Sequence, residues 1–180
     1  MSKAYSHPSI RLKQYPFVSW LVVGIFQGYF VYLAILMSLD QLNFGQLLSP
    51  TLQLPALLSS LNLMAFYPMT QIYQHEEDAA RNDLTLSRVL GIKGTFHFTG
   101  IVFGLSTLGY YFFYESKMLS QMPIFPIYLM ITGPSVLFFL VWYFLTLQNP
   151  QNANFKNTMI LNILGSLCLN LFFLTLIFAK

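Results

Sequence analysis

Charged residues are scarce in this 180-residue chain, in which nine Lys or Arg and six Asp or Glu make up 8% of the sequence. An average soluble domain carries about a quarter charged residues, so this composition argues against a compact soluble fold. The single cysteine, Cys168, excludes an internal disulfide and a cysteine-based metal site. The net charge of +3 is small. It reflects basic residues on one side of a membrane protein and does not indicate a nucleic-acid partner.

What the chain has instead is a set of long apolar runs without Asp, Glu, Lys or Arg. About twenty apolar residues cross a bilayer as a helix, since each residue rises about 1.5 Å. The sequence therefore predicts an all-α, polytopic membrane protein that forms a single transmembrane domain over residues 1–180. Its five expected transmembrane helices cover residues 16–39, 50–73, 94–114, 122–147 and 157–179.

The basic residues indicate how these spans are oriented. If five spans alternate in direction, seven basic residues fall on one side and two on the other. The side richer in Lys and Arg is normally cytoplasmic. We therefore expect residues 1–15 and the 74–93 loop to be cytoplasmic, and the inner or plasma membrane of a prokaryote as the location. The first side holds Lys3, Arg11, Lys13, Arg81, Arg88, Lys93 and Lys156, and the second Lys117 and Lys180.

The 74–93 loop holds four of the six acidic residues, within the segment QIYQHEEDAARNDLTLSRVLG that begins at Gln71. On a helix, Gln74 and Asp78 share a face, and Glu77 pairs with Arg81 four residues on. Oxygen ligands of this kind suit Mg²⁺, which takes one or two carboxylates together with waters and substrate phosphates. Nearby basic side chains would hold phosphate oxygens. The alternative, equally compatible with this spacing, is an ordinary solvated loop with a Glu77–Arg81 helix pair.

Two stretches resemble a known family. Residues 78–91 give D-x-x-x-N-x-x-T-L-x-x-x-L-G, which is similar to the second aspartate-rich motif of the UbiA-type intramembrane prenyltransferases. Residues 4–28, AYSHPSIRLKQYPFVSWLVVGIFQG, resemble the Tyr-Ser…Leu-Lys loop of the family and its following helix. The two matches occur in the family order. The five expected helices correspond to the last five of a nine-helix ring.

The resemblance implies an enzyme that uses Mg²⁺ to transfer a polyprenyl group from its diphosphate to a lipid-soluble acceptor, such as a quinone-type aromatic or a tetrapyrrole. It implies Asp78 as a metal ligand and catalytic residue. Gln74 stands at the position of an earlier aspartate, and Glu77, or alternatively Glu76, would replace that carboxylate. Lys13 matches the basic residue of the Leu-Lys loop and is the second catalytic candidate. The diphosphate-binding candidates are Lys13, Arg11, Arg81 and Arg88, and the substrate-cavity candidates are Tyr67, Gln71 and Tyr73.

One part of the family pattern does not occur in this sequence, namely the first aspartate-rich motif, N-D-x-x-D. We expect a second chain to supply it, or the chain to be a partial product of a longer enzyme; the incomplete ring also favours self-association. The remaining alternative is a degenerate relative that serves as a membrane scaffold or a small transporter-like protein.

Overall fold

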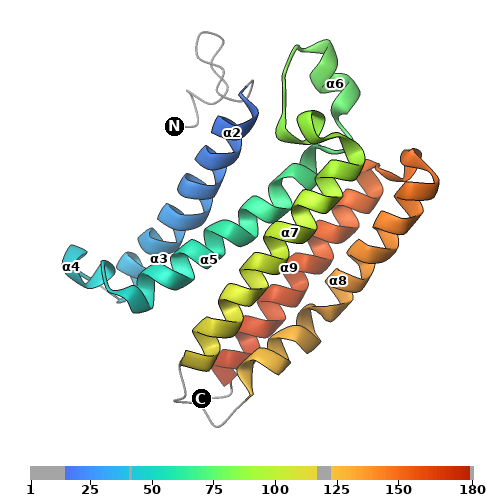
Figure 1. Ribbon diagram of the computed structural model, residues 1–180. Coiled ribbons are helices and arrows are strands. Elements are labelled where there is room, and N and C mark those ends of the chain that lie inside the picture. Colours follow the sequence, from blue (N-terminus) through green and yellow to red (C-terminus); the bar gives the residue numbers. More distant parts are fainter. Residues whose placement is uncertain (1–14, 41, 117–122, 179–180) are drawn as a thin grey trace. The chain divides into compact units, whose positions relative to one another are not determined.

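The computed structural model describes residues 15–40, 42–116 and 123–178, and every regular element in these ranges is a helix (Figure 1). Four helices are long and apolar enough to cross a membrane: Pro16–Leu39, Leu86–Glu115, Ile124–Gln148 and Phe155–Phe178. The predicted all-α, polytopic membrane fold is therefore confirmed. The chain forms two compact units, residues 1–113 and residues 114–180.

The first unit begins with one helix in three consecutive parts and continues through shorter elements to a long helix. In chain order these are α2 (Pro16–Val23), the π-helical η2 (Gly24–Tyr29), α3 (Phe30–Asp40), α4 (Phe44–Leu47), α5 (Pro50–Phe66), the 3₁₀ turn η3 (Tyr67–Gln71), α6 (His75–Ala80) and α7 (Leu86–Ser116), which reaches into the second unit. Pro16 and Pro50 occupy the first turns of α2 and α5, where a missing N–H costs nothing.

The expected span over residues 50–73 is built from two kinds of helix. The 17 residues of α5 rise about 25 Å, and the five residues of η3 add about 10 Å. Together they match the roughly 30 Å hydrocarbon core of a bilayer. That this segment crosses the membrane therefore remains a prediction, now with a specific geometry.

The first helix packs closely against α5 because two glycines lie four residues apart, at Gly24 and Gly28. The Ser60 hydroxyl donates to the Gly24 carbonyl at 2.6 Å. A Cβ placed on Gly28 would lie 2.5 Å from the Ser60 Cα. Small residues at this spacing let two membrane helices approach through their backbones, and the π-helical turn at the same place provides the exposed carbonyl.

A second contact between these helices depends on a proline. Pro68 has no N–H, so the Met64 carbonyl cannot make its usual helical hydrogen bond. Instead, the indole Nε1 of Trp20 donates to the Met64 carbonyl at 2.8 Å. In a membrane interior a carbonyl without a donor is costly, so Trp20 compensates for the proline.

We expect Trp20→Phe to lower the free energy of unfolding by about 1–2 kcal/mol, since it leaves the Met64 carbonyl without a donor. The measurement is denaturant unfolding of the protein in mixed micelles. In a Pro68→Ala background the regained N–H replaces the lost donor, so the same Trp20 substitution should cost less. An equal cost in both backgrounds would contradict this account.

Helix α7 runs antiparallel to α5 and is bound to it by hydroxyl groups. Thr99 donates to the Ala65 carbonyl at 2.9 Å, and Ser106 donates to the Leu58 carbonyl at 3.5 Å. Both hydroxyl residues are buried, and both bonds use the membrane-compatible pairing of a Ser or Thr side chain with a neighbouring backbone. This framework fixes the ends of α5 and α7 from which the polar loop projects.

The second unit is a helical hairpin of α8 (Ile124–Gln148), the 3₁₀ turn η4 (Pro150–Asn152) and α9 (Phe155–Phe178), with α8 and α9 side by side (Figure 1). The turn is closed by the Trp142 indole, which donates to the Asn152 carbonyl at 2.7 Å. Tyr128 and Phe172 pack edge to face across the hairpin. Large apolar side chains on its outside, including Leu137, are well exposed, as expected for surfaces solvated by lipid.

Candidate functional site

The polar loop begins with the short helix α6, whose C-terminal end has a defined turn. Asn82 has a positive φ of 56°, and its N–H donates to the Ala79 carbonyl at 3.1 Å. The next N–H, of Asp83, donates to the Asp78 carbonyl at 2.8 Å. This pair of bonds is a Schellman motif, which places a left-handed residue, usually Gly and sometimes Asn, after the helix. The Asn of the motif D-x-x-x-N therefore stands at the left-handed residue that ends α6.

Asp78 lies on the inner side of α6 and is buried. The hydroxyl of Thr85, itself buried, donates to the Asp78 Oδ2 at 3.2 Å. This bond uses only one oxygen of the carboxylate, so it orients the group without occupying both oxygens. Asp78 also lies in the first turn of α6, where the helix dipole favours negative charge. The first Asp and the Thr of the motif are thus bonded to each other.

Gly91 interrupts α7 one turn after its start, with φ 67° and ψ 175°. This conformation is essentially restricted to glycine. The Thr95 hydroxyl donates to the Gly91 carbonyl at 2.7 Å, which satisfies a group at the break. The Leu-Gly pair that closes the motif therefore marks the point where the loop joins the long helix.

His75, the first residue of α6, is bonded to the same region. Its Nε2 lies 2.8 Å from the Ser87 Oγ, and Ser87 Oγ lies 3.1 Å from the Thr95 Oγ1. Ser87 and Thr95 are fully buried. Burial lowers the pKa of the His75 imidazole; the nearby Asp78 acts in the opposite direction, and Arg88 adds to the lowering. His75 is accordingly neutral at pH 7.

The lowered pKa of His75 predicts a pH dependence of stability. Because the folded pKa lies below the ordinary value of 6.5, the unfolded chain binds the proton more readily. The contribution of neutral His75 should therefore be complete above about pH 6.5 and be lost as the pH falls through the folded pKa. Unfolding measured between pH 5 and 8 should show a shallower loss for His75→Gln. Identical pH profiles of the two proteins would contradict the prediction.

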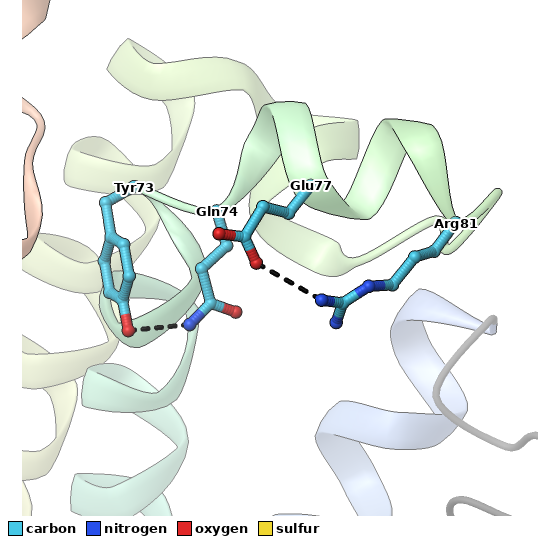
Figure 2. A network of polar contacts seen from close by, with 4 residues as sticks. All are labelled: Tyr73, Gln74, Glu77 and Arg81. Atoms are coloured by element: carbon cyan, nitrogen blue, oxygen red, sulfur yellow. Dashed lines mark hydrogen bonds and ion pairs between the residues drawn. The ribbon is translucent and has the colours of Figure 1, made fainter.

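A second group of side chains lies on α6 and at its two ends, as Figure 2 shows. It consists of Tyr73, Gln74, Glu77 and Arg81. The Gln74 side-chain amide donates to the Tyr73 hydroxyl at 2.6 Å. Arg81 and Glu77 form the expected helix pair at 3.4 Å, with side chains 59% and 69% exposed. An exposed pair of this kind contributes little stability.

The remaining sequence-predicted residues are distributed as follows. Arg88 donates to the Asp83 carbonyl, so it helps to close the loop. Gln71 and Tyr67 lie in η3. Gln71 is buried, and its Oε1 has no hydrogen-bond partner in the described part of the chain. Lys13 and Arg11 lie outside the described residues.

The loop contains three predicted Mg²⁺ ligands, Asp78, Glu77 and Gln74. In the ranges that the structure describes, no three His, Cys, Asp or Glu side chains come together to hold a metal. Asp78, Glu77 and Gln74 belong to one short helix and its N-cap, and they offer two carboxylates and one amide. Mg²⁺ commonly retains waters and completes its coordination with substrate phosphates. The structure gives these three side chains different partners: Asp78 is buried against Thr85, Gln74 is bonded to Tyr73, and the exposed Glu77 is paired with Arg81.

Sequence reasoning missed three participants, Thr85 as a ligand-orienting donor and the Ser87–Thr95 pair. A signal was present in the spacing of four residues between Ser87, Gly91 and Thr95, which places such residues on one face of an unbroken helix. The spacing could not predict that Ser87 contacts His75, because this contact depends on the turn at Asn82.

Comparison with known proteins gives one decisive result. The sequence pattern of the UbiA prenyltransferase family matches residues 1–177. The chain belongs to the UbiA prenyltransferase family. No curated protein and no solved structure matched it. The resemblance inferred from residues 78–91 and 4–28 is thereby confirmed.

Membership of the UbiA family gives the observed geometry a functional setting. It implies an integral membrane protein with a prenyltransferase-type function, in a family whose enzymes generally depend on Mg²⁺ and act on prenyl diphosphates and lipophilic acceptors. The second aspartate-rich motif of this UbiA chain is a folded unit, in which Asp78 is bonded to Thr85 and the chain reverses at Asn82.

Proposed function

We propose that this chain forms one half of a Mg²⁺-dependent prenyltransferase site, which transfers a polyprenyl group from its diphosphate to an aromatic, quinone-type or tetrapyrrole-type lipid acceptor. The observation that carries the proposal is the buried Asp78 carboxylate, oriented by Thr85 at the head of the family motif. In this proposal the first aspartate-rich motif lies outside residues 1–180, in a second chain or in a longer form of this enzyme. The 74–93 loop faces the cytoplasm, as the distribution of basic residues favours.

In this proposal Asp78 is the principal anionic ligand, with Glu77 as the second carboxylate and Gln74 as a neutral oxygen ligand. Mg²⁺, when bound, would stabilise the charge of the departing diphosphate. Asp78 is held in place before the substrate arrives, since Thr85 fixes one of its oxygens. A preorganised charge of this kind needs little rearrangement during the reaction.

Basic residues would bind the diphosphate oxygens from the other side. Arg81 is exposed beside Glu77, and its guanidinium can form paired hydrogen bonds with phosphate. Arg88 uses one nitrogen for the Asp83 carbonyl, while a guanidinium offers five N–H donors in all. Lys13 and Arg11 complete this set, and Lys13 is the one that we assign to catalysis.

The substrate cavity in this proposal adjoins η3. Gln71 supports the assignment, because a buried amide oxygen without a donor costs free energy that a bound hydroxyl or N–H group would recover. Tyr67 belongs to the same turn, and Tyr73 follows it with its hydroxyl bonded to Gln74. These three residues would line the passage between the diphosphate and the lipid-soluble acceptor.

The test is binding of farnesyl diphosphate to the full chain in nanodiscs, with Mg²⁺ and with EDTA. We expect binding that requires Mg²⁺ and that farnesol does not reproduce, because the alcohol lacks the diphosphate. Glu77→Gln should weaken Mg²⁺-dependent binding, whereas the adjacent Glu76→Gln removes the same charge and serves as the matched control. Absence of Mg²⁺-dependent binding in any condition would contradict the proposal and favour a membrane scaffold.

A further inference from the structure

The hydrogen bonds between His75 and Gly91 form a chain whose direction follows from counting protons. The Thr95 hydroxyl has one proton and two carbonyls within reach, that of Gly91 at 2.7 Å and that of Ser87 at 3.3 Å. When the proton goes to either carbonyl, the Thr95 Oγ1 accepts from the Ser87 hydroxyl, 3.1 Å away. Ser87 Oγ then accepts from His75 Nε2 at 2.8 Å. In this arrangement His75 carries its proton on Nε2.

This chain connects the acidic helix to both sides of the break in α7. Ser87 lies before Gly91 and Thr95 lies after it, and both are fully buried. The acidic helix has a second attachment at Thr85, which donates to Asp78. Together with the backbone bonds of the turn at Asn82, these two attachments restrict the orientation of α6.

We propose that His75 is a positioning residue, which through Ser87 and Thr95 fixes the orientation of α6 and so holds the Asp78 carboxylate ready for a divalent cation and diphosphate. This inference rests on the proposed function and deepens it. His75 does not contact the reacting groups. Its role is that of an outer partner that orients a ligand-bearing element, and loss of such partners typically lowers metal affinity 10- to 100-fold.

Three variants distinguish this role from general stabilisation. His75→Phe keeps the ring volume but cannot donate to Ser87. Ser87→Ala removes the link between His75 and Thr95. His75→Gln is the conservative replacement, because its terminal amide places a donor near the position of Nε2. As a matched control, Thr99→Val removes a buried hydroxyl bond to the Ala65 carbonyl, at a place remote from α6 in the sequence.

The measurement is the affinity of the full chain in nanodiscs for Mn²⁺ with inorganic diphosphate, followed by electron paramagnetic resonance. We expect His75→Phe and Ser87→Ala each to weaken Mn²⁺ binding about tenfold. The double variant should be no weaker than either single one, because both break the same chain. His75→Gln should retain near-normal affinity, and Thr99→Val should lower the thermal stability without changing the affinity.

Hydrogen exchange of the amides of residues 76–81 separates this inference from the proposed function. Faster exchange in His75→Phe and Ser87→Ala, with normal exchange in Thr99→Val, supports the positioning role even if the wild-type chain binds no Mn²⁺. In that case the proposed function alone fails. Unchanged exchange together with unchanged Mn²⁺ affinity overturns the positioning role. An effect of Thr99→Val on affinity equal to that of Ser87→Ala would also overturn it.

Discussion

Asp78→Asn should lower the turnover of the reconstituted enzyme by roughly 10²- to 10³-fold while the protein remains folded. The substitution removes the charge that faces Mg²⁺, an interaction worth several kcal/mol of transition-state stabilisation, and each 1.36 kcal/mol corresponds to about a tenfold change in rate. The amide oxygen of Asn can still accept the hydrogen bond from Thr85, so we expect a change of less than about 1 kcal/mol in the free energy of unfolding.

The comparison with Thr85→Val makes this prediction specific. That variant keeps the carboxylate and removes only the group that orients it, so we expect a smaller loss of turnover, about tenfold. The two variants should be measured by transfer of a radiolabelled prenyl group, after the missing aspartate-rich motif has been supplied in trans. Turnover of Asp78→Asn close to the wild-type value would remove Asp78 from the site.

Gly28→Leu should produce the largest loss of stability among the substitutions considered, at least about 3 kcal/mol. A Cβ at this position meets the Ser60 backbone at 2.5 Å, and backbone cannot move aside as a flexible side chain can. Overpacking a core typically costs about 1–3 kcal/mol even where side chains adjust. Separation of the first helix from α5 would also break the bond from Ser60 to the Gly24 carbonyl.

Gly104→Leu is the matched control for this substitution. Gly104 lies in α7, and a Cβ built on it has nothing within 4 Å. Replacing a helical glycine at such a site usually gains about 0.5–1 kcal/mol. Unfolding of both variants in mixed micelles should therefore show changes of opposite sign. Similar stabilities for Gly28→Leu and the wild type would contradict the close packing of the first helix on α5.

The long apolar runs were sufficient to predict the fold class, because each helix must satisfy its own backbone in lipid. They could not predict that η3 replaces the last turns of the second run. That change follows from Pro68, which leaves the Met64 carbonyl to accept a hydrogen bond from Trp20, 44 residues earlier in the sequence. Hydropathy indicates only how well each helix is solvated by lipid. It does not indicate which side chain of one helix donates a hydrogen bond to a carbonyl of another.

The candidate site was predictable to the extent that its residues form a local motif. Asp78, Asn82 and Gly91 could be singled out from sequence, since a family-motif aspartate and two residues that tolerate unusual backbone conformations leave a local signature. His75 could not be given a role in this way. Its bond to Ser87 spans 12 residues and depends on the reversal at Asn82, so only the folded loop shows that the histidine supports the acidic helix.

The backbone conformation at Gly91 favours one configuration, L or D, of any residue that replaces this glycine. A Cβ added at Gly91 would meet nothing within 4 Å, so space does not limit this position. The limit is φ, which is positive at 67° and is unfavourable for residues of L configuration. For a D-amino acid the same angles are the mirror image of ordinary extended backbone. The backbone angles at this break therefore suit a D-alanine, whereas an L-alanine would oppose them.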